Sequence, residues 1–449
     1  MSKDLFQDKK LFQQLYEVTR LDPSLYPLHS IKQGLRNENG TGVLVGLTRI
    51  AGVYGYEIKD GKKIPAKGRL LYRGIDMETI VSGIQKDGRF GFEETTFLLL
   101  FGVLPTEEQL REFQDCLNAL APLPEHFKED VFFKIPSRNL MNKLQRVLLT
   151  LYSYDEAADD ISLANTLRQS LSIIAKMPTI LAYAYRAKLH YFDGESLIIH
   201  NHRPEYSIAE NVLHLIRDDS TFERWEAELL DLCLIVQAEH GGGNNSTFTT
   251  HVVSSTGTDT YSALSAAVGS LKGPKHGGAN AKVMGMIRDM KQNCNWRDRA
   301  SLRDYMRKIL RKEAYDGMGL IYGMGHAVYT ISDPRAQLLK KRLQELSVRA
   351  HCEDEVQLLE NIESITHELM HDAHREAPIC ANVDLYTGLL YRMLKIPDDL
   401  ATPLFALARM GGWCAHRLEQ LSDKKIMRPA YVTIGEEQHY LPIKERSFE

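Results

Sequence analysis

Several features that would direct a protein to a membrane or an export route are missing from this sequence. No run of 18 apolar residues occurs, and the N-terminal segment MSKDLFQDKKLFQQL has neither the basic start nor the unbroken apolar stretch of a signal peptide. We therefore expect a cytoplasmic protein. The formal net charge of -4 is spread along the chain, so neither nucleic acid nor a membrane surface is implied as a partner.

The cysteines lack any pattern of a disulfide framework or a metal site. There are six, far apart and without a CxxC pair. We expect them to be reduced and mostly buried. They are Cys116, Cys233, Cys294, Cys352, Cys380 and Cys414.

Helical periodicity is the dominant pattern that the sequence does contain. Stretches of alternating apolar and polar residues are short and few, and the segment from Gly52 to Tyr72 is the best candidate for a β-hairpin. A chain of 449 residues has ample length to bury a core and suggests two domains. The pattern predicts a mainly helical fold.

Capping signals predict where several helices begin and end. Thr106 with Gln109, and Ser220 with Glu223, have the spacing of capping boxes, and the second helix should end at the glycines 241–243.

Three further helices are predicted from apolar patterns, breakers and a start signal. The segment 261–271 is small and apolar all round, as in a helix buried on every side, and another helix should begin near Gly277. Thr402 and Pro403 have the residue types of an N-cap and a first helical position.

Four short segments concentrate histidine, arginine and aspartate beside glycine and proline. They are EHGGGNNS, GPKHGGAN, GMGHAVYTISDPR and NVDLYTG. Rigid turns of this kind can direct polar side chains into a cleft, although a single histidine is more often a hydrogen-bonded structural residue than a catalyst. The order and spacing of all four carry the information.

Taken together, these segments closely resemble the citrate synthase family. The resemblance runs from Gly34-Leu35-Arg36-Asn37 and LYRGID at 71–76 through to Arg428-Pro429. Its most specific parts are GPKHGGAN, GHAVYTISDPR and NVD. Nearly the whole chain is covered.

The resemblance implies an all-α fold with the active site in a cleft between two domains. The large domain would comprise residues 1–277 and 389–449, with a small helical domain inserted at 278–388. The family also implies a homodimer.

The function that the resemblance implies is that of a citrate synthase, an acyltransferase that converts the acyl group to an alkyl group on transfer. It would condense acetyl-CoA with oxaloacetate and hydrolyse citryl-CoA, the entry step of the tricarboxylic acid cycle. No cofactor or metal is implied, because the coenzyme A thioester is a substrate.

Three catalytic residues follow from matching the family motifs. Asp384 would remove a proton from the acyl methyl group, His276 would donate a hydrogen bond to the thioester oxygen, and His326 would polarise the keto group of oxaloacetate. A carboxylate can be made a stronger base by partial desolvation, and a helix N-terminus would keep His276 neutral. From the residues alone, Asp384 could instead cap a helix starting at Leu385.

Four residues are implied as ligands of oxaloacetate: His240, Arg335, Arg409 and Arg428. Arginine suits bidentate recognition of carboxylates. Arg335 follows Asp333-Pro334, a strong helix start, so Asp333 could equally compensate its charge. Arg428 would serve the neighbouring subunit's active site, or it could belong to a solvated basic tail.

Two positions depart from the family pattern. The position after Tyr329, usually basic and linked to the coenzyme A phosphates, is Thr330 here, and Lys275 stands where an apolar residue is common. Lys275 could replace the missing charge or face solvent.

Three other functions remain as alternatives. The nearest is 2-methylcitrate synthase, which uses propionyl-CoA with the same catalytic residues. A non-catalytic sensor of organic acid or CoA would not need Asp384. The third is a zinc metalloprotease, because His367-Glu368-Leu369-Met370-His371 is a literal HExxH, but His374 and Ala377 fail the extended metzincin pattern.

Overall fold

The computed structural model describes residues 9–60, 62–373, 378–435, 437 and 439–446. The chain divides into two units, 46–426 and a second one formed by 1–45 with 427–449. The second unit holds α1 (Lys9–Thr19), α2 (Leu25–Leu28) and two short 3₁₀ turns, Gln33–Leu35 and Ile443–Glu445. Its residues are mostly exposed.

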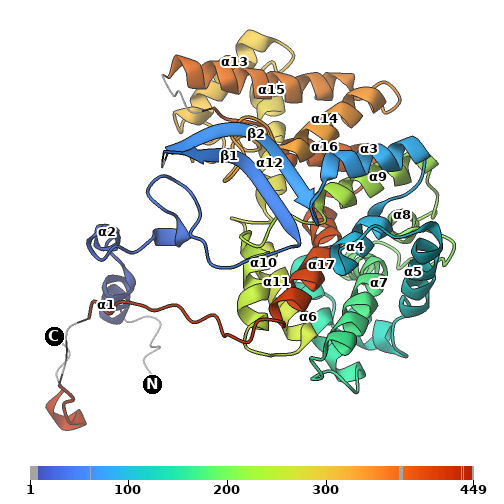
Figure 1. Cartoon of the computed structure of the whole chain (residues 1–449). Helices are drawn as coiled ribbons and strands as arrows, with labels where there is room; N and C mark the ends of the chain where they lie inside the picture. The colour runs from blue at the N-terminus through green and yellow to red at the C-terminus, as the bar shows by residue number, and fades with distance from the viewer. Residues whose placement is uncertain (1–8, 61, 374–377, 436, 438, 447–449) are drawn as a thin grey trace. The chain divides into compact units, whose positions relative to one another are not determined.

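The larger unit is built almost entirely of helices, and the predicted fold class is confirmed (Figure 1). The helices of its first half are α3 (Met77–Asp87), α4 (Phe92–Phe101), α5 (Glu107–Leu120), α6 (Leu140–Leu151), α7 (Leu163–Lys188), α8 (Ile208–Ile216), α9 (Arg224–Gln237) and α10 (Asn245–Ser254). Those of its second half are α11 (Thr260–Lys272), α12 (Ala279–Asn293), α13 (Arg299–Leu310), α14 (Pro334–Leu346), α15 (Glu353–Asp372), α16 (Val383–Met393) and α17 (Ala401–Gln420).

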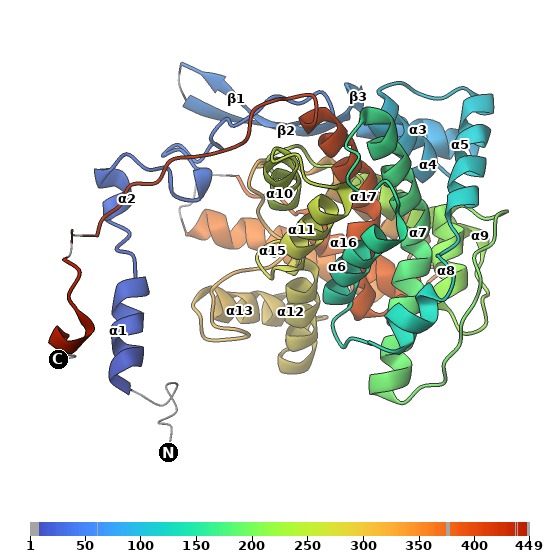
Figure 2. The same cartoon turned by 90° about the horizontal axis from the view of Figure 1, so that it is seen from below.

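The central element of the packing is α17. It contacts α4, α7, α9, α10 and α11, and Figure 2 shows it between α7 and the α10–α11 pair. Its buried residues include Trp413 and Met410, both with no exposed surface. Small residues allow the close approach, since a Cβ at Gly412 would lie 2.3 Å from a carboxylate oxygen of Glu239. Helix α17 therefore holds its polar side chains in fixed positions within the core.

Helices α12 to α16 form a second group of contacts. Helix α12 packs on α13 and α16, α14 on α15 and α16, and α13 on α15. They occupy the same stretch of chain as the small domain expected at 278–388, but those boundaries stay a prediction. Figure 1 shows α13 and α15 at one end of this unit, away from α5 and α7.

The predicted hairpin is confirmed. Strand β1 (Ala51–Lys59) pairs antiparallel with β2 (Lys62–Tyr72), in a register that places Ala51 opposite Tyr72, and the short β3 (Ile75–Asp76) completes a three-stranded sheet.

The first capping box is confirmed and the second is wrong. Thr106 caps α5 with Gln109 as its reciprocal partner. Ser220 has φ 57°, a left-handed conformation that belongs to the preceding turn, so α9 begins only after Glu223, whose backbone N–H donates to Glu226 at 2.7 Å. That helix also ends at Gln237, ahead of the predicted glycines.

The remaining boundaries were predicted with mixed success. The buried helix expected at 261–271 is α11, and the helix expected near Gly277 is α12. The N-cap predicted at Thr402 is wrong, because a 3₁₀ turn at Asp398–Leu400 runs directly into α17 and starts the helix at Ala401. Pro403 still lies in the first turn, where its missing N–H is harmless.

The six cysteines are free, and four of them are buried, as predicted; Cys116 is exposed and Cys294 half-buried. Over the described part of the chain, no helix is both long and apolar enough to cross a membrane.

Candidate active site

Asp384 lies in the first turn of α16, as its second residue. The N-cap is Asn382, whose side-chain oxygen accepts the backbone N–H of Asp384 at 3.0 Å. The alternative role of Asp384 as the cap of a helix starting at Leu385 is therefore wrong. Burial raises the pKa of Asp384 to about 6; Arg335 opposes this rise and Asp333 adds to it. The side chain is left available as a base near neutral pH.

The loop of His326 is fastened to the segment that leads into Asp384. The backbone N–H of Gly325 donates to Cys380 at 2.8 Å, and that of Asn382 donates to Gly323 at 2.9 Å. Both glycines have positive φ, 85° for Gly323 and 89° for Gly325, a conformation that other residues rarely adopt. The two segments form one rigid support for His326 and Asp384.

The ring of His326 is held in one tautomer by the backbone. Its Nδ1 accepts the N–H groups of Val328 and Tyr329, both at 3.0 Å. Because a nitrogen that accepts two N–H groups carries no proton, the neutral ring has its proton on Nε2. Nε2 lies 3.5 Å from Nη2 of Arg335; in this tautomer both atoms are donors, so the contact is not a hydrogen bond between them. His326 can therefore donate a hydrogen bond from Nε2.

His276 lies in the turn between α11 and α12. Its Nε2 is 2.9 Å from the hydroxyl of Ser246 and 3.3 Å from the backbone N–H of that residue, at the start of α10. The pKa of His276 falls to about 4, chiefly because the ring is buried and further because of Arg409. The ring is therefore neutral at physiological pH. The principal cause is burial, and not the helix dipole on which the prediction from the sequence relied.

Arg335 is the second residue of α14, which begins at the predicted helix start Asp333-Pro334 with Asp333 as its N-cap. Asp333 accepts its backbone N–H at 3.0 Å and pairs with its guanidinium at 2.7 Å, with both side chains buried. The contact that sequence analysis offered as an alternative to a substrate carboxylate is thus present. It leaves the Arg335 guanidinium fixed beside His326.

His240, just beyond the end of α9, and Arg409, on α17, approach the same site. The ring centroids of His240 and His326 are 5.0 Å apart, and the two ring planes make an angle of 79°. Burial, followed by Arg335, holds the pKa of His240 well below its ordinary value, so this ring is neutral. Arg409 is 1% exposed and donates from Nε to the carbonyl of Gln237 at 2.8 Å.

Several buried polar atoms at this site have no hydrogen-bond partner among the described residues. They are Nε2 of His240, Nη2 of Arg409 and the hydroxyl of Tyr329. A buried polar group without a partner costs roughly 1–3 kcal/mol, and native proteins tolerate few of them. An imidazole and a guanidinium in this state indicate a site that binds a polar ligand with acceptor groups.

Six of the seven predicted site residues are therefore linked by contacts or electrostatic interactions: His240, His276, His326, Arg335, Asp384 and Arg409. The seventh, Arg428, is exposed and belongs to the other unit. Ser246 and Tyr329 are not among the site residues predicted from the sequence. Both stand inside the quoted motifs, but their contacts with His276 and His326 depend on the tertiary fold.

The two positions that depart from the family pattern lie near this site. Lys275 is exposed, and the hydroxyl of Thr330 donates to the carbonyl of Gly55 in β1 at 3.4 Å.

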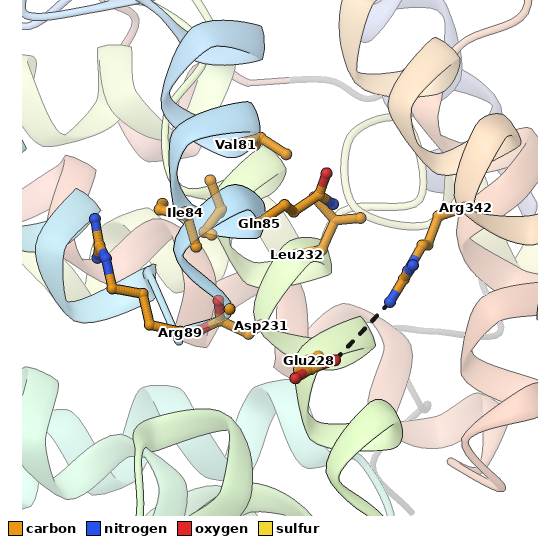
Figure 3. A pocket seen from close by; sticks show the side chains of 10 residues that line it. Val81, Ile84, Gln85, Arg89, Glu228, Asp231, Leu232 and Arg342 are labelled. Carbon is orange, nitrogen blue, oxygen red and sulfur yellow. Dashed lines mark ion pairs between the residues drawn. The ribbon is translucent and has the colours of Figure 1, made fainter. Parts of the chain in front are cut away.

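A cavity of about 160 Å³ between α3, α9 and α14 lies apart from these residues (Figure 3). Arg342 and Glu228 face each other across it at 4.0 Å. Asp231, on its wall, accepts the backbone N–H groups of Gly91 and Phe92 at the start of α4. This cavity contains none of the predicted site residues.

The HExxH motif lies on α15. Glu368 pairs with Arg299 at 2.5 Å and with Arg303 at 3.4 Å, and in the described part of the chain no three His, Cys, Asp or Glu side chains are grouped to hold a metal ion. The extended-motif positions His374 and Ala377 lie outside the described residues.

Comparison with known proteins gives a consistent result along the sequence. Residues 39–430 match the protein family described as "Citrate synthase, C-terminal domain". The citrate synthase of Synechocystis sp. is 33% identical over 382 residues, covering 84% of this chain and 88% of that protein. The 2-methylcitrate synthase of Shewanella oneidensis is 32% identical over 379 residues, with 84% and 92% covered.

Solved structures give the same result. Citrate synthase from Thermotoga maritima superposes with a TM-score of 0.73 at 29% identity, covering 93% of this chain and 99% of that one. Citrate synthase from Thermoplasma acidophilum, solved as a ternary complex with carboxymethyl coenzyme A and oxaloacetate, also has a TM-score of 0.73, at 25% identity and the same coverage.

Proposed function

This chain belongs to the citrate synthase family, and on that premise we propose that it condenses acetyl-CoA with oxaloacetate and hydrolyses citryl-CoA to citrate and coenzyme A. It is an enzyme of the citrate synthase type, a transferase. We further propose that it acts in the cytoplasm as a homodimer, at the entry step of the tricarboxylic acid cycle.

The observation that carries the proposal is the environment of Asp384. A carboxyl group with a pKa of about 6 lies on a segment that is hydrogen-bonded to the loop of a neutral, proton-donating histidine. Removing a proton from a methyl group needs a base that is ionised yet poorly solvated. The carboxylate of Asp384 would take that proton, leaving an enolate on the thioester.

The two histidines would stabilise the charge that develops on oxygen. With Nε2 occupied by Ser246, His276 would donate from Nδ1 to the thioester oxygen of the enolate. His326 would donate from Nε2 to the keto oxygen of oxaloacetate and make its carbon more electrophilic. The enolate carbon then attacks that carbon, and water cleaves the thioester to release coenzyme A.

Oxaloacetate would be held by the polar groups around these rings. The unpartnered Nε2 of His240 and Nη2 of Arg409 would bind its oxygen atoms, with the His240 proton on Nε2, and Arg335 stands beside His326. Arg428 from the neighbouring subunit would complete the set.

Acyl-CoA preference tests the proposal against its nearest alternative. We expect kcat/KM with oxaloacetate to be about 10- to 200-fold higher for acetyl-CoA than for propionyl-CoA, because one extra methylene in a fitted pocket changes binding by about 1–3 kcal/mol. Release of the coenzyme A thiol gives the rate for both substrates. A higher value for propionyl-CoA would identify a 2-methylcitrate synthase, and binding of oxaloacetate without any turnover would identify a sensor.

The pH dependence of the reaction should report the ionisation of Asp384. Since the carboxylate is the active form, kcat/KM for acetyl-CoA is expected to fall as the pH drops through about 6 and to approach a tenfold loss per pH unit below it. The pKa of His276, about 4, lies too low to cause this. A rate that stays constant down to pH 5 would contradict the assignment.

The cleft is expected to close on oxaloacetate before acetyl-CoA binds productively. An enolate must form away from water, and premature hydrolysis of the thioester must be avoided. The proposed hinges are near Gly277 and Gly388. Small-angle scattering should give a smaller radius of gyration with saturating oxaloacetate than without it; equal dimensions would contradict closure.

A further inference from the structure

We propose that Tyr329 is a positioning residue for His326, and that its aromatic ring, rather than its hydroxyl group, fixes the plane in which His326 presents Nε2 to the keto group. This inference rests on the proposed function and assigns a specific task to a residue within the same site.

Tyr329 makes two contacts that restrict the His326 ring, in addition to the N–H of Val328 that donates to Nδ1. The Tyr329 and His326 rings are stacked, with centroids 4.6 Å apart and planes at 24°. The backbone N–H of Tyr329 also donates to Nδ1 of His326 at 3.0 Å. The hydrogen bond selects the tautomer, while the stack limits rotation of the ring about the bond to its Cβ.

The hairpin supports Tyr329 from behind at two glycines. A Cβ at Gly55 would lie 2.6 Å from the carbonyl oxygen of Val328 and 2.9 Å from Cα of Tyr329. A Cβ at Gly68 would lie 1.9 Å from the carbonyl oxygen of Ser332 and 2.9 Å from the Tyr329 ring. The backbones of β1 and β2 therefore pack directly against the loop that carries Tyr329, and Tyr329 is only 1% exposed.

The opposite side of the pair is closed by a third ring and a cation. His240 meets Tyr329 edge-on at 5.5 Å, and the Arg335 guanidinium lies 5.9 Å from the centre of the Tyr329 ring. The ring of Tyr329 is thus enclosed between the hairpin and the groups proposed to bind oxaloacetate. A displaced Tyr329 ring would remove the stack and leave rotation of the His326 ring less restricted.

The hydroxyl group of Tyr329 takes no visible part in this arrangement. It is buried and has no hydrogen-bond partner among the described residues. Removing such a group is close to neutral, whereas removing the ring deletes the stack. Tyr329→Phe and Tyr329→Met therefore form a matched pair, since methionine retains apolar volume but has no flat face.

The first expected result is a rescue by phenylalanine. Tyr329→Phe should keep kcat within about 3-fold of the wild type. Tyr329→Met should lower kcat by about 10- to 100-fold, because the donor is no longer held in line with the keto oxygen. The KM for oxaloacetate should change little in both variants, since the arginines are untouched.

A spectroscopic measurement separates positioning from general packing. In the 13C spectrum of bound [2-13C]oxaloacetate, the keto carbon should be shifted downfield from its free position in the wild type and in Tyr329→Phe, and lie nearer to the free position in Tyr329→Met. The proposal is wrong if the keto-carbon shift in Tyr329→Met equals that in the wild type. It is also wrong if Tyr329→Phe reduces this shift as much as Tyr329→Met does.

Two further experiments test the proposal if Tyr329→Met does not fold or if the wild type neither binds nor converts oxaloacetate. If Tyr329→Met does not fold, Gly55→Ala tests the same contact from the hairpin side and should give the same reduced shift; a wild-type shift in that variant would overturn the proposal. If the wild type neither binds nor converts oxaloacetate, the proposed function fails. The ring is then judged from 15N spectra of ligand-free protein, with His326 signals assigned by their loss in His326→Asn. One sharp set of His326 ring signals in the wild type and exchange-broadened signals in Tyr329→Met support the positioning role, and identical spectra reject it.

Discussion

Asp384→Asn is expected to lower turnover by about 10²-fold or more while leaving oxaloacetate binding nearly intact. Only the removal of a proton from carbon requires the base, and an amide cannot accept that proton. None of the groups proposed to hold oxaloacetate lies on α16: Arg335 is on α14, Arg409 is on α17, and His240 follows the end of α9. Steady-state kinetics with acetyl-CoA, together with calorimetric titration of oxaloacetate, measure the two quantities separately.

Folding of the variant provides a control, because the structure predicts the direction of its stability change. The folded-state pKa of Asp384 is about 6, above the ordinary 3.8, so the ionised carboxylate costs folding free energy at higher pH. Relative to the wild type, Asp384→Asn should gain stability as the pH rises from about 4 through 6. Thermal unfolding at pH 5 and pH 8 measures this difference.

Two outcomes would count against Asp384 as the base. A loss of turnover of only a few fold would leave it with a structural role. Equal losses in turnover and in oxaloacetate affinity would point to a distorted site.

Sequence patterns predicted best those features that depend on neighbours along the chain. The capping box at Thr106 and the N-cap at Asp333 involve residues two or three positions apart, and both are present. Ser220 failed because its backbone is left-handed, and Thr402 failed because a preceding 3₁₀ turn supplies an earlier start for α17. A capping pattern alone does not reveal the backbone conformation of the residues at and before it.

The candidate site was predictable as a set of residues but not as a set of contacts. Four motifs that are far apart in the sequence meet only through tertiary packing, as when the loop of His326 hydrogen-bonds to the segment before Asp384. The sequence predicts a neutral His276 from the dipole of the following helix, whereas burial is the main cause of its lowered pKa. Burial depends on neighbours in the fold, which the sequence alone does not place. The stack of Tyr329 on His326 is likewise a matter of three-dimensional arrangement.

Arg428 gives the second large expected effect, which concerns assembly. We predict that Arg428 serves the active site of the neighbouring subunit, so that Arg428→Ala and Asp384→Ala are each inactive as homodimers. Arg409 and Arg335 can hold carboxylate oxygens from one chain, and a third guanidinium from the partner would complete the site only in the dimer. An isolated subunit would then be inactive.

Subunit mixing separates this prediction from a role within one chain. When the two inactive variants exchange subunits at equal concentrations, random pairing makes half of the dimers mixed. Each mixed dimer then has one site in which both Arg428 and Asp384 are intact, so roughly a quarter of full activity should return.

A parallel mixture of Asp384→Ala with His326→Ala is the control, because both residues belong to the same site in the same chain and no activity should reappear. If the Arg428→Ala mixture also stays inactive although exchange is verified by mass spectrometry, Arg428 acts within its own chain. If Arg428→Ala alone is fully active, it belongs to the solvated basic tail with Lys424 and Lys425, and the site is complete without it.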